Sequence, residues 1–189
     1  MWIALSLIVI SVVYRLLAVN IDFLPNVAPL MAIAFCGAIY LPKRWALIVP
    51  VGALLISDLA LNVHYGVSLL DWSMLVRIAC YLLAACLGFW AAQSKTWPRL
   101  IGGSLAGSLI FYIASNTMAW LQEPLYAKTL AGLWQAQTVG LPGYPSSWLF
   151  FRNSLISDLA FTVIFVLCME WSRRSSAKES STVQSATLS

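Results

Sequence analysis

The segment SMLVRIACYLLAACLGFWAA, residues 73–92, decides the fold class, because it is apolar for long enough to cross a lipid bilayer as one helix. Two of its residues are unusual in lipid: Arg77 carries a full charge, and Cys80 lies on the same helix face one turn further on. An ionisable side chain in a membrane span usually faces a bundle interior or a wet cavity, so Arg77 indicates such a cavity. The alternative stays open that Arg77 snorkels to the interface and that Cys80 only fills space.

The rest of the chain has the same character, since 61% of its 189 residues are hydrophobic and 10% are charged. Hydrophobic windows use nearly the whole chain and leave no room for a soluble domain. The sequence therefore predicts an all-α polytopic membrane protein with one transmembrane domain of six helices, residues 1–171. The expected spans are residues 1–19, 27–41, 46–63, 73–92, 100–121 and 148–171, followed by a polar tail, residues 172–189, that composition predicts to be disordered.

Basic residues predict the orientation of this bundle, because short cytoplasmic loops are enriched in Lys and Arg. They follow the second, fourth and sixth spans: Lys43, Arg44, Lys95, Arg99, Arg173, Arg174 and Lys178. These ends lie on one side of a six-span bundle, so we expect both termini in the cytoplasm. The net charge of +4 reflects this topology and gives no indication of a nucleic-acid partner.

The loop over residues 122–147 is much longer than the other loops and is rich in Pro and Gly. Loops of this length are uncommon in compact proteins and often close binding sites. Residues 127–139 within it have the pattern of a short amphipathic helix. We expect a lid across the outer mouth of the bundle; the alternative is a helix that rests among lipid headgroups.

Polar residues gather in the outer half or near the midplane of five expected spans, whereas the inner half of the bundle is almost wholly apolar. The set is Arg15, Asp58, Arg77, Asn116, Arg152, Asn153 and Asp158. Asp58, Arg77 and Arg152 fall at similar depth, and a buried carboxylate needs a cation, so we expect ion pairing among them. Two roles stay open for the set: a ligand site in an outward-opening cavity, or ion pairs that only join helices.

The four cysteines all lie inside expected spans and form no C-x-x-C pair, which gives no indication of a disulfide framework or a zinc site. Only Cys80 falls in the outer half of its span. Arg77, one turn away, favours its thiolate, the form that binds soft transition metals. Because no G-x-x-x-x-G-K-[ST] motif occurs, energy for any transport must come from a partner or a gradient.

These features resemble the substrate-binding S components of energy-coupling-factor (ECF) vitamin transporters. The residues that carry the resemblance are NVAP at 26–29, the stretch from Val49-Pro50 to Ser57-Asp58, residues 126–132, GLP at 140–142, Asn153, and DLAFT at 158–162. Within that superfamily the chain looks most like the solitary cobalamin-uptake proteins called BtuM. The resemblance implies six spans with both termini inside, a multi-pass protein of the bacterial cytoplasmic (inner) membrane, and a pocket closed by outer loops.

The resemblance also implies a function, the capture and uptake of cobalamin (vitamin B12) from the outer face. A cysteine in this part of the chain binds cobalt in that family, and Cys80 is the matching position. Cobalamin is then a bound substrate, the chain has no cofactor of its own, and Cys80 is the catalytic residue if the thiol helps to remove a cyanide ligand from cobalt. The candidate substrate-contacting residues are Asn26, Asp58, His64, Tyr65, Arg77, Asn116, Tyr126, Arg152, Asn153 and Asp158.

One feature departs from the family pattern. Many S components carry A-x-x-x-A in the first span for docking onto a coupling module with ATPases, whereas here Ala4 is followed by Ile8. Two other functions remain as alternatives: an S component for a different vitamin, with Arg77 and Arg152 binding an anionic group, or an envelope scaffold without a small-molecule ligand. A membrane-embedded hydrolase is the least favoured function, because the one histidine has no Ser-His-Asp or metal-ligand spacing around it.

Overall fold

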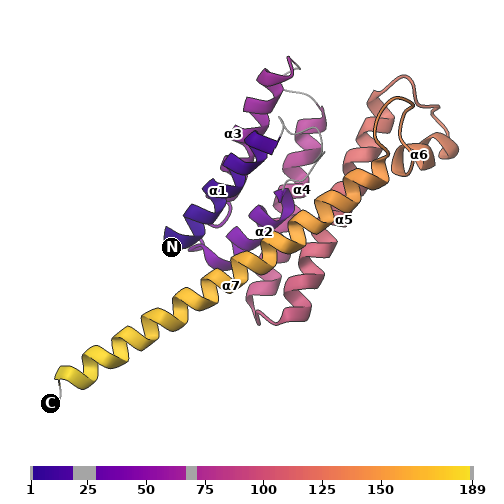
Figure 1. The fold of residues 1–189 in the computed structure, drawn as a ribbon. Coiled ribbons are helices and arrows are strands. Elements are labelled where there is room, and N and C mark those ends of the chain that lie inside the picture. Colours follow the sequence, from indigo (N-terminus) through magenta and orange to yellow (C-terminus); the bar gives the residue numbers. More distant parts are fainter. Residues whose placement is uncertain (1, 19–28, 67–71, 188–189) are drawn as a thin grey trace.

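The computed structural model describes residues 2–18, 29–66 and 72–187, and these residues form helices and connecting turns but no strands. The helices are α1 (Trp2–Ala18), α2 (Leu30–Tyr40), α3 (Ile48–His64), α4 (Trp72–Ala92), α5 (Trp97–Gln122), α6 (Leu130–Gln137) and α7 (Ser147–Thr187). Figure 1 shows α1 and α3 side by side, and α6 at one end of the bundle, beside the ends of α5 and α7. The prediction of an all-α fold is confirmed.

Three of the described helices are long and apolar enough to cross a membrane: α4, α5 and the part Ser147–Ser175 of α7. These helices indicate a membrane protein, but they are fewer than the six spans predicted. α2 has 11 residues and rises only about 16 Å, because Pro29 precedes it and Pro42 follows it closely. α1 and α3 have 17 residues each and rise about 25 Å, slightly less than the hydrocarbon core of a bilayer.

The last helix is longer than predicted. α7 continues to Thr187, past the boundary expected at residue 171 and into the tail for which disorder was expected. No Gly or Pro follows Ser147 in the sequence, so nothing in the chain interrupts the helix. Adding residues to an existing helix also costs less than starting a new one.

α2 is the centre of the fold, because every residue from Leu30 to Ile39 is buried. It packs mainly against α4, with further contacts to α7 and α5. Glycines allow neighbouring helices to approach α2 closely. A Cβ at Gly37 of α2 would lie 2.2 Å from Cγ of Pro50 on α3, and one at Gly103 of α5 would lie 2.5 Å from the Phe35 ring of α2. The small residues of α2 and its neighbours therefore serve helix packing.

The two ends of the bundle differ chemically. We call the end that carries α6 and residues 123–146 the cap end, and the opposite end, with the turns at residues 41–47 and 93–96, the basic end (Figure 1). At the basic end the Nζ atom of Lys95 lies 4.8 Å from the centre of the Tyr40 ring. Exposed tryptophans mark both ends: Trp72, Trp134 and Trp148 at the cap end, and Trp45, Trp90, Trp97 and Trp171 at the basic end.

Candidate functional site

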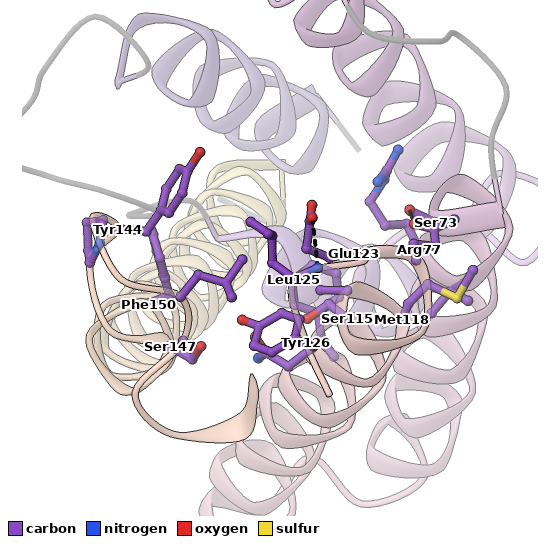
Figure 2. Close-up of a pocket in the computed structure, with 18 residues that line it drawn as sticks. Ser73, Arg77, Ser115, Met118, Glu123, Leu125, Tyr126, Tyr144, Ser147 and Phe150 are labelled. Carbon is purple, nitrogen blue, oxygen red and sulfur yellow. Dashed lines mark hydrogen bonds between the residues drawn. The ribbon is translucent and has the colours of Figure 1, made fainter. Parts of the chain in front are cut away.

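A cavity of about 690 Å³ opens at the cap end. Its wall is built by the start of α4, the second half of α5, the loop over residues 123–146 on both sides of α6, and the first turn of α7. Figure 2 shows Ser73, Arg77 and Met118 on one side, Tyr144, Ser147 and Phe150 on the opposite side, and Glu123, Leu125 and Tyr126 between them. A smaller recess of about 120 Å³ shares Phe111, Ser115, Asn116 and Phe150 with it and reaches between α5 and α7.

The loop that borders the cavity has its own local structure. α6 begins after Thr129, whose side chain accepts a hydrogen bond from the Gly132 backbone nitrogen at 3.2 Å, which satisfies one of the unpaired N–H groups at the helix start. Gly132 leaves room for the chain to fold back, since a Cβ there would lie 1.9 Å from the Ala127 oxygen. Gly140, at φ +73, turns the chain after α6. The helix predicted within residues 127–139 is therefore present, with the bounds Leu130–Gln137.

Side-chain hydrogen bonds attach this loop to α5. The Tyr112 hydroxyl donates to the Gln137 carbonyl oxygen, and Nε2 of Gln137 donates to Oγ1 of Thr117 at 3.0 Å. Nε1 of Trp120 donates to the Ala127 carbonyl oxygen at 2.8 Å. The loop is thus a hydrogen-bonded part of the cavity wall.

An ionic network lies on the α4 side of the cavity. The Asp58 side chain is 2% exposed, and one of its carboxylate oxygens accepts a hydrogen bond from the Arg15 guanidinium in an ion pair. Its other carboxylate oxygen accepts hydrogen bonds from Nε of Arg77 at 3.3 Å and from the Tyr81 hydroxyl at 3.1 Å. The predicted pairing of Asp58 with Arg77 is confirmed, and Arg77 also lines the cavity. Arg152 takes no part, because it is exposed and its guanidinium donates to Oδ1 of the adjacent Asn153 at 3.1 Å.

Asp158 lies away from the cavity, fully buried in the middle of the bundle. One carboxylate oxygen accepts a hydrogen bond from the Ala32 backbone nitrogen at 3.0 Å, and the other accepts from the Ser108 hydroxyl at 2.7 Å. Ala32 is in the first turn of α2, where Pro29 provides no side-chain cap. Asp158 therefore caps α2 from α7, which suits the positive end of the helix dipole.

The other predicted contact residues divide into two groups. Asn116 and Tyr126 line the cavity together with Arg77. Burial and the neighbouring Glu123 raise the pKa of Tyr126, so its phenol stays neutral at physiological pH. His64 and Tyr65 are exposed at the end of α3, with ring centres 5.2 Å apart.

Two predicted residues lie elsewhere. Asn153 lines a different, apolar groove of about 540 Å³ between α1 and α7. Asn26 is outside the described residues.

Cys80 is 3% exposed and belongs to the buried core, not to the residues that line the cavity. Its neighbour on α4, Arg77, reaches the cavity because it lies one turn nearer the cap end. Cys86, further along the same helix, is exposed. Among the residues that the structure describes, no group of three His, Cys, Asp or Glu side chains is arranged to hold a metal ion.

Sequence reasoning missed much of the cavity wall. Glu123, Leu125, Leu141, Tyr144 and Phe150 all line it, but they carry no motif. The available signal was the length of the loop and its Pro and Gly content, which indicated a binding loop without indicating which side chains point inward.

Residues 1–181 match a protein family described as Family of unknown function (DUF6580). No curated protein and no solved structure matches the chain. Because the family match covers nearly the whole length, the chain belongs to this family of unknown function.

Proposed function

We propose that this protein is a membrane-embedded, substrate-binding transport protein that captures cobalamin at the outer face of the bacterial inner membrane. The observation that carries the proposal is the cavity of about 690 Å³ at the cap end, bordered by a hydrogen-bonded loop. Its volume falls in the range of small-molecule sites, and its wall mixes apolar side chains with a few polar ones. The choice of cobalamin depends on the sequence resemblance to the solitary S components.

The proposed topology has six membrane-embedded helices with both termini in the cytoplasm. The shortness of α2 is compatible with it, because non-helical backbone at membrane depth is tolerated where protein surrounds it, and α2 is buried on all sides. Trp97 and Trp120 stand 23 positions apart on α5, about 35 Å, which suits two tryptophan belts at the two interfaces. Lys43, Arg44 and Arg99 at the basic end favour the cytoplasmic side for that end.

The proposed cobalt ligand is the Cys80 thiolate. Cys80 lies three residues beyond Arg77 on α4, about 4.5 Å deeper along the helix axis. Because the thiol is buried in the described conformation, cobalt binding requires the cavity floor to open by about one helical turn. We therefore expect ligand binding to involve a rearrangement around Cys80 as well as occupation of the existing cavity.

In this proposal, no coupling module docks onto the face of α1 that carries the small-residue motif in many S components. Ala4 and Ile8, at the positions of the family docking motif, are 0% and 1% exposed. This face of α1 packs against the protein's own core, which supports a solitary transporter.

The decisive experiment is cobalamin binding by the purified full chain. We expect cyanocobalamin to bind with a changed corrin absorption spectrum, Cys80→Ala to lose that change, and Cys86→Ala, an exposed position on the same helix, to keep it. An unchanged spectrum with the unsubstituted protein contradicts the cobalt ligand. Growth of a cobalamin-requiring host that lacks its own uptake system tests transport.

Mass spectrometry of copurified molecules distinguishes the alternatives. A different vitamin favours an S component of other specificity. A preparation that binds no small molecule favours an envelope scaffold.

A further inference from the structure

Glu123 is the carboxylate of the cavity. It follows the last residue of α5, is half-buried, and lines the cavity between the α4 side and the α7 side (Figure 2). Its carboxylate accepts only one hydrogen bond within the described chain, a long one of 3.5 Å from the Leu125 backbone nitrogen. Lys128 is near in sequence, but its ammonium group donates to the carbonyl oxygens of Trp120 and Glu123. In the part of the chain that the structure describes, no cation pairs with this carboxylate.

Arg77, the cation that lines the cavity, already has a partner within the protein. Arg77 is already engaged by Asp58, with Nε 3.3 Å from the carboxylate oxygen. An incoming anion would have to compete with that buried carboxylate. The cavity therefore has a cation that is already paired within the protein, through a carboxylate that it shares with Arg15, and a carboxylate that has no such partner among the described residues.

Two neighbouring polar side chains strengthen this asymmetry. Oγ of Ser115 donates to the Tyr112 carbonyl oxygen at 3.2 Å, and Nδ2 of Asn116 donates to the same oxygen at 2.9 Å. Both residues line the cavity. The Ser115 hydroxyl hydrogen and one of the two Asn116 amide hydrogens are used on their own helix, so both side-chain oxygens remain as acceptors for a ligand and Asn116 keeps one further donor hydrogen.

We infer that Glu123 is a specificity-determining residue that selects ligands presenting N–H donors, such as primary amides, and disfavours ligands presenting a carboxylate at the same position. The inference depends on the proposed function and deepens it: the N–H donors are the amide side chains at the edge of the corrin ring. A carboxylate in place of such an amide meets Glu123 as a like charge, which is unfavourable in a partly desolvated site.

The test compares two forms of one ligand. The purified full chain is titrated with cyanocobalamin and with its b-, d- and e-monocarboxylic acids, in each of which one peripheral amide is replaced by a carboxylate. We expect the unsubstituted protein to bind at least one of the acids about tenfold or more weakly than the amide parent. Glu123→Gln keeps the shape of the side chain without its charge, so the difference should fall to about threefold or less. Glu170→Gln, at a half-buried glutamate that does not line the cavity, is the matched control and should leave the difference unchanged.

The outcomes separate this inference from the proposed function. Equal affinity of the unsubstituted protein for amide and acids overturns the role of Glu123, even if the Glu123→Gln protein cannot be purified. If Glu123→Gln prefers cyanocobalamin over the acids as strongly as the unsubstituted protein does, the role of Glu123 is also overturned, while the proposal of cobalamin binding stands. Failure of the unsubstituted protein to bind any of these corrinoids overturns both proposals.

Discussion

Arg15 of α1 and Asp58 of α3 form an ion pair in the interior of the bundle, although 43 positions separate them in the sequence. The second oxygen of the Asp58 carboxylate receives Arg77 and Tyr81 from α4. One carboxylate thus joins three helices, and it supplies a negative charge to two guanidinium groups that are largely removed from solvent. Removing it leaves buried cations without this partner, which is more costly than losing one surface contact.

We expect Asp58→Ala to lower the free energy of unfolding by about 3–5 kcal/mol, the range for breaking a buried ion pair from one side. Thermal or denaturant unfolding of the purified protein in detergent measures this change. Glu170→Gln is the control, because the Arg173–Glu170 pair is exposed and its loss should cost less than about 1 kcal/mol. Equal effects of the two substitutions would show that the Asp58 network does not stabilise the fold.

The same network shows what the sequence was able to predict. Asp58 and Arg77 fall at equal depth on neighbouring spans, and depth alone was enough to expect their pairing. Arg15 was recognised as a polar residue in the same layer, but its pairing with Asp58 depends on α1 lying beside α3 and on the rotation of both helices. Arg152 has a similar depth and faces outward. The depth of a residue in the membrane follows from counting along its span. The neighbour that its side chain faces depends on how the helices pack, which no local sequence pattern encodes.

The candidate site was predictable to a similar extent. Arg77, Asn116 and Tyr126 were expected and line the cavity. Asp158 was expected there as well, because a buried carboxylate commonly marks a functional site, but it caps α2 instead. That role was not predictable from the sequence, since it depends on the first turn of α2 beginning at mid-depth beside α7.

The capping role of Asp158 gives a second prediction. Asp158→Ala should lower the free energy of unfolding by about 2–4 kcal/mol, because the Ala32 N–H group and the Ser108 hydroxyl both lose a buried acceptor. Asp158→Asn keeps one oxygen for Ala32 and should cost roughly half as much. Unfolding measured by circular dichroism distinguishes the two. An alanine variant as stable as the asparagine variant would argue against a cap.

Close packing around α2 gives a third prediction. Gly37→Ala should destabilise the protein by about 1–3 kcal/mol, because the new Cβ would lie 2.2 Å from Cγ of Pro50 on α3. Gly102→Ala is the matched control on α5, where no atom lies within 4 Å of the added Cβ, and the better helix propensity of alanine should stabilise by about 0.5–1 kcal/mol. Thermal unfolding of both variants checks the prediction. Opposite signs are expected, and destabilisation by Gly102→Ala alone would contradict the helix arrangement.

The proposed orientation gives a fourth prediction, tested with two single cysteine substitutions. Leu130 is 85% exposed on α6 at the cap end, and Ser94 is exposed in the turn between α4 and α5 at the basic end. A membrane-impermeant maleimide added to intact cells should label Leu130→Cys, while Ser94→Cys should react only after the membrane is permeabilised. The unsubstituted protein, with its four native cysteines, gives the background. Labelling of Ser94→Cys from outside would place the basic end outward, and the cavity would then open to the cytoplasm and be unable to capture a ligand from the outer face.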